Sequence, residues 1–163
     1  MPQAQTQQFG PVEYREEDAI EFPLGLPAFE EEHRFLAIER PQTKPLVYLQ
    51  SLGRADLCFI ALPLLVVDPT YQLAVSAEDL RILGLTDFLD SGTQPEIGKD
   101  VEALAIMSVT NSRPTANLLA PVLVRKSSPD AQSGEATPRK GLQAIRGDKR
   151  YSHQQVWGVR APC

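Results

Sequence analysis

Apolar residues in this chain gather in short runs that proline or glycine interrupts, a pattern typical of a domain built mainly from β-strands. The clearest strands are predicted at residues 34–39, 46–52 and 57–62. The third run is apolar on both alternating faces, which predicts a strand that is covered on each side and ends at Pro63. More strands are predicted in five further segments: 71–75, 101–110, 117–124, 141–146 and 151–159.

Turn residues divide the second half of the chain. An Asn-Ser-Arg-Pro sequence at 111–114 predicts a turn between the strands at 101–110 and 117–124. Pro121 predicts that the second of these strands lies at an edge or carries a bulge. The segments 141–146 and 151–159 are expected to pair with each other around Gly147 and Asp148.

One short helical region is predicted in the middle of the chain. Ser76 is suited to cap a helix that starts after it, with Asp79 at the third helical position and Gly84 placed to end it. Phe88 and Leu89 indicate a second short helix before residues 92–95 break the pattern. The chain is therefore predicted to be mainly β with a short helical insertion.

The most constrained segment is residues 20–30, which contains two prolines and a glycine among apolar residues. Pro23 and Pro27 fix their own φ angles, and Gly25 permits the positive φ that a tight bend requires. Four large apolar side chains are held in this segment: Phe22, Leu24, Leu26 and Phe29. They either plug one end of the core or present an apolar surface to a partner, and both interpretations stay open at this point.

Length and composition favour a single domain. The chain has 163 residues, 42% of them apolar, which is enough for one sizeable core. Residues 1–10 are rich in glutamine and are predicted to be a disordered lead-in to a domain at 11–163. Residues 127–140 contain no apolar side chain larger than proline and are predicted to be a flexible loop.

The chain has the composition of a cytoplasmic protein. No apolar run approaches the ~20 residues that a membrane-spanning helix needs, and the start of the chain lacks the pattern of a secretory signal. Cys58 lies in an apolar run and Cys163 is the last residue, so a disulfide between them is not expected. Membrane partners are not predicted.

Charge is distributed unevenly along the chain. The net charge is −5, but from Arg125 onward eight basic residues face three acidic ones, while the first 124 residues hold eight basic and eighteen acidic ones. The two parts therefore carry +5 and −10. An acidic body favours association with a basic partner and disfavours nucleic acid.

Catalytic chemistry is not evident in the sequence, and an enzyme, a cofactor or a metal site is not predicted. Only two histidines are present, His33 and His153, and His33 follows a run of three glutamates that is typical of a solvated turn. Cys58 has apolar neighbours, which indicates a buried structural thiol. A small hydrolase would require that His33 or His153 meets a nucleophile.

A basic region near the C-terminus supports an alternative, direct binding of nucleic acid. Its residues are Arg125, Lys126, Arg139, Lys140, Arg146, Lys149 and Arg150, with Tyr151 and Trp157 available for stacking. The charges are spread over a loop and two strands, so a solvated hairpin is the favoured interpretation.

Three blocks in order carry a resemblance to a known family. The first is Ile20, Phe22, Gly25, Leu26, Pro27, Ala28 and Phe29; the second is Pro45, Leu46, Leu49, Gln50 and Ser51, followed by the strand at 57–62; the third is Thr115, Asn117, Leu118, Ala120 and Pro121. A weaker fourth block begins at Gly141 and Gln143. With these blocks the chain resembles the flagellar assembly factor FliW family over residues 12–157. Ala28 replaces a glycine that is usual in the family, and residues 127–140 form an insertion.

The resemblance implies a small antiparallel β-barrel-like domain and a non-enzymatic regulator. Members of the family bind the RNA-binding translational repressor CsrA and also bind flagellin. A partner switch would follow, in which free factor holds CsrA and relieves repression of flagellin synthesis until flagellin occupies the factor. A chaperone role toward flagellin is a further implication.

The predicted partner-binding residues come from the first three blocks and the acids beside them. They are Glu17, Asp18, Glu21, Phe22, Leu24, Gly25, Leu26, Pro27, Phe29, Leu49, Gln50, Ser51 and Asn117. The acidic group next to the first block, with Glu13 and Glu16 added, is expected to steer a basic partner toward the domain.

Overall fold

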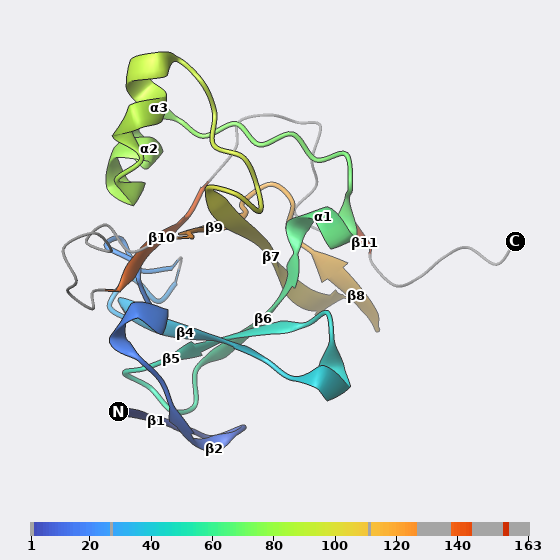
Figure 1. Cartoon of the computed structure of the whole chain (residues 1–163). Helices are drawn as coiled ribbons and strands as arrows, with labels where there is room; N and C mark the ends of the chain where they lie inside the picture. The colour runs from blue at the N-terminus through green and yellow to red at the C-terminus, as the bar shows by residue number, and fades with distance from the viewer. Residues whose placement is uncertain (1, 27, 111, 127–137, 145–154, 157–163) are drawn as a thin grey trace, which may run out of the picture.

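The structure is a computed structural model that describes residues 2–26, 28–110, 112–126, 138–144 and 155–156 (Figure 1). Its strands are β1 (Gln3–Thr6), β2 (Gly10–Glu13), β3 (Ala19–Glu21), β4 (Arg34–Glu39), β5 (Val47–Ser51), β6 (Cys58–Pro63), β7 (Val101–Thr110), β8 (Arg113–Ala116), β9 (Val122–Arg125), β10 (Arg139–Gln143) and β11 (Gln155–Val156). Its helices are α1 (Leu64–Val67), α2 (Ala77–Leu83) and α3 (Thr86–Ser91), with 3-10 turns η1 (Glu16–Asp18) and η2 (Pro41–Thr43).

Seven strands close into a barrel. The order of neighbours is β7-β6-β5-β4-β3-β10-β9, and pairing of β9 with the first half of β7 completes the circle. All these pairs are antiparallel except that of β10 with β3, which is parallel. β8 continues the sheet from the second half of β7, and β11 pairs with β8. The predicted fold, a mainly β and barrel-like single domain, is confirmed.

Alternation of side chains along the strands fills the barrel and covers its outside. On β4, Phe35 packs in the interior cluster, whereas Leu36 packs outside against the β1–β2 hairpin. On the paired strand β5, Leu49 is interior and Tyr48 exterior. This period of two is the reason that these segments form strands with one apolar set on each face.

Two elements cover the outer faces of the barrel, as Figure 1 shows: the β1–β2 hairpin at one side and the helices α2 and α3 at the other. The hairpin buries Ala4 and Tyr14 against β4 and β5. Leu80 and Leu83 of α2 pack with Leu123 and Leu142 on the outside of β9 and β10.

The helix signals are confirmed in detail. The Ser76 side chain accepts a hydrogen bond from the backbone N–H of Asp79 at 3.1 Å, and Gly84 ends α2 with φ 74°. Phe88 and Leu89 lie in α3, which ends at Gly92.

The lead-in prediction is wrong for the described residues 3–6, which form β1 instead of a disordered segment. Gln3 to Thr6 pair with Gly10 to Glu13, and the Thr6 hydroxyl donates to the Gly10 carbonyl at 2.8 Å. The many glutamines in this segment favoured a prediction of disorder, although its alternate residues Ala4 and Thr6 are buried in a strand. Pairing satisfies the backbone, so few apolar side chains suffice for order.

Three strand predictions need correction. Residues 71–75 form no strand; the Tyr71 hydroxyl instead donates to the carbonyl of Leu118 at 2.8 Å. Of the strand predicted at 117–124, only the end is strand, in β9, and β8 lies before the segment. The Asn117 side chain accepts hydrogen bonds from the N–H groups of Leu119 and Ala120 and turns the chain between the two strands. β6 is covered on both faces except around Ile60, which is 40% exposed, whereas Leu62 on the same face is fully buried.

The C-terminal predictions are tested only in part. Residues 127–137 of the predicted loop lie outside the described residues, whereas Arg139 and Lys140 belong to β10. The pairing expected between the segments 141–146 and 151–159 is not found between β10 and β11. β10 pairs with β3 and β9, and β11 pairs with β8. No helix among the described residues has the length and apolar character that crossing a bilayer requires.

Candidate partner-binding site

The first motif forms a compact loop that closes one end of the barrel, and residues 22–33 are called the plug loop here. Phe22 and His33 at its two ends are joined by a hydrogen bond from the Phe22 N–H to the His33 carbonyl at 2.7 Å. Inside it, the N–H of Gly25 donates to the carbonyl of Phe22 at 2.9 Å, and the N–H of Phe29 donates to that of Leu26 at 2.8 Å. Pro27 lies outside the described residues.

Aromatic side chains from the plug loop and the strands fill this end of the barrel. The rings of Phe22 and Phe35 meet edge to face at 5.4 Å, and those of Phe29 and Phe59 at 5.5 Å. Phe22 is fully buried and Leu26 is 1% exposed. These two side chains offer no surface to a partner, so for them the plug interpretation holds.

Two bends with positive φ give the plug loop its shape. Gly25 has φ +65°, and a Cβ there would lie 2.5 Å from the backbone of Glu30. Only glycine fits such a position. Ala28 has φ 72° although it carries a side chain.

Leu24 points away from the plug. It is 60% exposed, the largest value among the large apolar side chains in the described part of the chain. Glu30 and Glu31 of the same loop are exposed, and Glu30 accepts a hydrogen bond from the N–H of Ala28 at 3.2 Å. The loop thus displays one apolar side chain beside carboxylates.

The second motif, residues 49–51 of β5, lies buried beside the plug loop. Leu49, Gln50 and Ser51 are fully buried. The Gln50 Nε2 atom lies 3.0–3.2 Å from the carbonyl oxygens of residues 51, 54, 55 and 57, while its Oε1 atom has no partner among the described residues. Gln50 therefore fixes the turn between β5 and β6.

Ser51 connects this turn to the plug loop. Its hydroxyl donates to the Glu32 carboxylate at 3.0 Å and accepts the N–H groups of Gly53 and Arg54. The Arg54 guanidinium then lies 5.9 Å from the ring centre of Phe29. Residues 49–51 shape the site but do not offer contact area themselves.

Comparison with known proteins places these motifs in one family. The sequence model of the FliW protein family matches residues 3–156. The chain belongs to the FliW family. The chain is 32% identical to the flagellar assembly factor FliW of Syntrophomonas wolfei, over 88% of this chain and 80% of that protein. It is 27% identical to the flagellar assembly factor FliW of Bacillus pumilus, over 98% of each chain.

A solved structure agrees with the fold. The crystal structure of a flagellar assembly factor FliW superposes with a TM-score of 0.73 at 25% identity, covering 95% of this chain and 96% of that one. The FliW chain described here accordingly has a role in flagellar assembly.

Three of the five acids beside the plug loop form ion pairs with neighbouring cations. Both carboxylate oxygens of Glu16 accept from Arg34 at 2.8 Å, Glu17 pairs with Arg15 at 3.4 Å, and Glu21 pairs with Lys140. The hydrogen bonds that Arg34 donates to Glu16 raise the pKa of Arg34. Asp18 accepts the backbone N–H of Arg15 at 3.3 Å. The negative electrostatic field of this acidic group is therefore weaker than the number of its acids implies.

Glu30 and Glu31 were missed as site residues by sequence reasoning. Neither forms an ion pair with another described residue, and both stand beside Leu24 in the loop. The glutamate run next to the first motif was the available signal, but a solvated turn explained it equally well. Asn117, which was predicted, is half-buried and turns the chain through its side-chain oxygen.

The described part of the basic region is occupied by contacts within the domain. Arg125 donates to the Gly84 carbonyl, Lys126 pairs with Glu102 at 2.9 Å, and Arg139 donates to the Asp18 carbonyl. Lys140 pairs with Glu21. The remaining predicted residues, Arg146, Lys149, Arg150, Tyr151 and Trp157, lie outside the described residues. The four described cations are thus engaged in the fold.

The candidate catalytic groups show no constellation in the described part of the chain. His33 is exposed, and its Nδ1 atom lies 2.9 Å from the Phe22 carbonyl oxygen. Cys58 is half-buried, and burial raises the pKa of its thiol. No group of three or more potential metal ligands occurs among the described residues, and His153 lies outside them.

Proposed function

We propose that this FliW-family chain is a non-enzymatic, cytoplasmic regulator that binds a CsrA-type RNA-binding repressor and flagellin in turn. While flagellin is scarce the chain holds the repressor and relieves repression of flagellin synthesis. When flagellin accumulates it occupies the chain, which then also acts as its chaperone. The observation that carries this proposal is the plug loop, a fixed acidic loop with one exposed leucine and no catalytic group.

The charge of the chain supports a basic partner. An RNA-binding repressor must offer a basic surface, and the first 124 residues of this chain carry −10. Opposite charge increases the rate of encounter, while a rigid loop reduces the conformational entropy lost when the complex forms. Leu24 supplies the apolar contact and Glu30 and Glu31 supply the local field.

A pull-down from the cytoplasm of the source organism, followed by mass spectrometry, tests the proposal. The tagged chain is expected to recover both the repressor and flagellin, and added flagellin is expected to release the repressor. Recovery of neither protein would contradict the proposal. Retention on a polyanion that falls steeply with salt would instead support direct nucleic-acid binding.

A substitution at Leu24 tests the plug loop with a matched control. Leu24→Asp is expected to weaken binding of the purified repressor about tenfold or more, since an anchoring apolar contact is worth 1–3 kcal/mol. Leu65→Asp is the control, because Leu65 is 38% exposed on α1. Helix α1 follows the end of β6 that lies away from the plug loop. Equal effects of both substitutions on binding would exclude the plug loop as the contact.

A further inference from the structure

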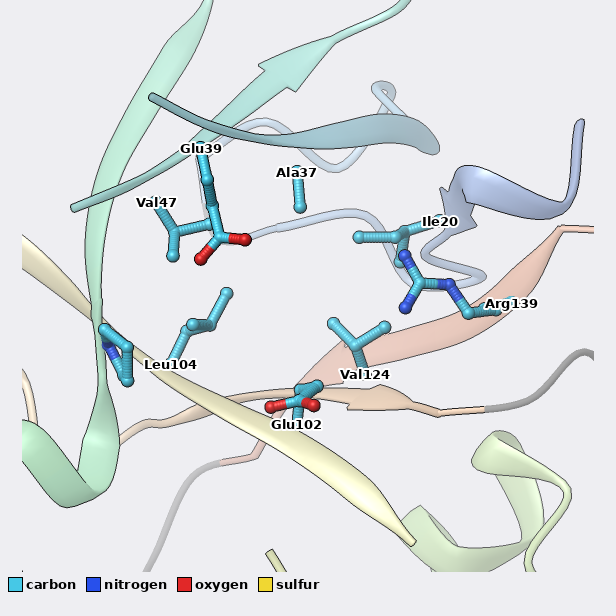
Figure 2. Close-up of a pocket in the computed structure, with 9 residues that line it drawn as sticks. Ile20, Ala37, Glu39, Val47, Glu102, Leu104, Val124 and Arg139 are labelled. Atoms are coloured by element: carbon cyan, nitrogen blue, oxygen red, sulfur yellow. The ribbon is translucent and has the colours of Figure 1, made fainter. Parts of the chain in front are cut away.

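The two ends of the barrel differ. Phenylalanines close one end, but the other end retains a hollow of about 290 Å³, which is lined by residues of all seven barrel strands (Figure 2). Its walls include Ile20, Val47, Leu104 and Val124, all of which are nearly fully buried. This hollow lies away from the plug loop and takes no part in the proposed function.

Charged side chains face this hollow from inward positions of the strands. Glu39 follows Phe35 and Ala37 on the inner face of β4, Glu102 precedes Leu104 on β7, and Arg139 pairs in register with Ile20. The interior of a small closed barrel is normally filled by side chains. Glu39 is exposed, and Glu102 and Arg139 are partly exposed, so these charges stand at the open mouth of the hollow, next to its buried apolar walls.

Two of these charges oppose each other without pairing. In Figure 2 the Glu39 carboxylate and the Arg139 guanidinium lie on opposite sides of the hollow and point toward it. No ion pair joins them or engages Glu39 with another described residue, whereas Glu102 pairs with Lys126 at 2.9 Å. Arg139 donates from Nη2 to the Asp18 carbonyl at 3.3 Å, and its Nε atom has no acceptor among the described residues.

The charge pattern selects among ligand classes. A cation would meet Arg139, an anion would meet Glu39, and an apolar group would remove water from both charges without replacing it. A molecule with both an ammonium and a carboxylate satisfies Glu39 and Arg139 together with charge-assisted hydrogen bonds. The apolar walls then suit a short aliphatic group on the same molecule.

We propose that the open end of the barrel binds a small zwitterion with an aliphatic side chain, the chemical class of a free α-amino acid. Its ammonium lies at Glu39, its carboxylate at Arg139 and its side chain over Val47 and Leu104. The ligand contacts β4, β5, β7 and β10 of the folded barrel. Because it binds the folded state, its binding raises the free energy of unfolding.

L-Leucine is the probe, measured by isothermal titration and by methyl NMR of the full chain. Saturable binding with shifts of the Ile20, Val47 and Val124 methyl signals is expected. L-Leucinamide, which lacks the carboxylate, and 4-methylpentanoate, which lacks the ammonium, are each expected to bind about tenfold more weakly, the equivalent of one charge-assisted hydrogen bond. No binding of leucine, or equal binding of all three compounds, would overturn the proposal.

Variants locate the site. Glu39→Gln is expected to remove the preference for leucine over 4-methylpentanoate, and Arg139→Gln the preference for leucine over leucinamide. Glu31→Gln at the plug end is the matched control and should leave leucine binding unchanged. Methyl NMR spectra without ligand report whether each variant is folded. A folded variant at Glu39 and another at Arg139 that both keep the original preferences would place the ligand elsewhere and overturn the assignment.

Discussion

Ala28 is held in the left-handed region of the backbone although it carries a Cβ atom. Residues other than glycine pay about 1–2 kcal/mol for this conformation. The plug loop keeps the conformation because the hydrogen bond from the Phe29 N–H to the Leu26 carbonyl and the buried side chains around it fix the loop. The loop thus keeps a backbone conformation that glycine would adopt without strain.

Ala28→Gly is expected to raise the free energy of unfolding by about 0.5–1 kcal/mol, since relief of strain exceeds the added entropy of the unfolded chain. Urea denaturation measures it. Ala74→Gly is the control, because Ala74 is also exposed outside helices and strands but does not have a positive φ. The control should lose stability, and a loss in both variants would contradict the strain at Ala28.

Gln50 is the other residue whose role the structure reveals. Gln50→Leu removes the donor for the carbonyl oxygens around it and is expected to lower the free energy of unfolding by about 1–3 kcal/mol, the cost of leaving buried acceptors unpaired. Gln42→Leu, at an exposed position in η2, is the control and should change stability little. Similar denaturation curves for both variants would show that the turn does not depend on Gln50.

Cys58 gives a pH-dependent prediction. Burial raises the pKa of this thiol, so the reactive thiolate is scarcer than for an ordinary cysteine at the same pH. In a Cys163→Ser background, alkylation of the folded protein should be slower than that of the unfolded protein, with a midpoint shifted to higher pH. Rates that coincide for the two states would contradict the burial effect.

At the scale of elements, helix α2 is defined by its two ends. Ser76 caps the start and Gly84 ends it, and both signals were predicted from the sequence. Such signals are local, because the capping atoms lie within three residues of the groups they satisfy. The prediction of a strand at residues 71–75 was wrong, because nothing local distinguishes a strand from an extended segment whose Tyr71 hydroxyl donates to the carbonyl of a residue 47 positions away.

The cap itself is testable. Ser76→Ala is expected to lower the free energy of unfolding by about 1 kcal/mol through loss of the bond to the Asp79 N–H. Ser108→Ala serves as the control, since this serine is exposed on β7. Thermal denaturation measures the stability of both variants. A loss of stability in Ser76→Ala no larger than in Ser108→Ala would argue against the cap.

At the scale of the whole molecule, charge and shape separate the two ends of the barrel. The plug end is filled and carries Glu30 and Glu31, which form no ion pair with another described residue, while the open end holds charges of both signs. The acids predicted from sequence to steer a partner are mostly paired with arginine or lysine. Local charge, more than net charge, is therefore expected to direct a partner to the plug loop.

The double variant Glu30→Lys and Glu31→Lys tests this expectation. It should slow association with the basic repressor and reduce the salt dependence of the association rate, measured by stopped flow. Asp90→Lys with Glu96→Lys changes the net charge by the same amount on α3 and the loop after it, and should have a smaller effect. Equal rates for the two double variants would assign steering to net charge alone.

The sequence by itself determined what depends on neighbouring residues: the strand periods of β4, β5 and β7, the ends of α2, and the motifs that place the chain in its family. Tertiary structure alone decided which side chains of one motif face inward. Phe22 and Leu26 are interior while Leu24 is exposed, and Gln50 is buried among the carbonyl groups of the β5–β6 turn. The physical reason is that closure of the barrel through β7 and β9 brings together residues far apart in sequence, and burial and ion pairing follow from that closure.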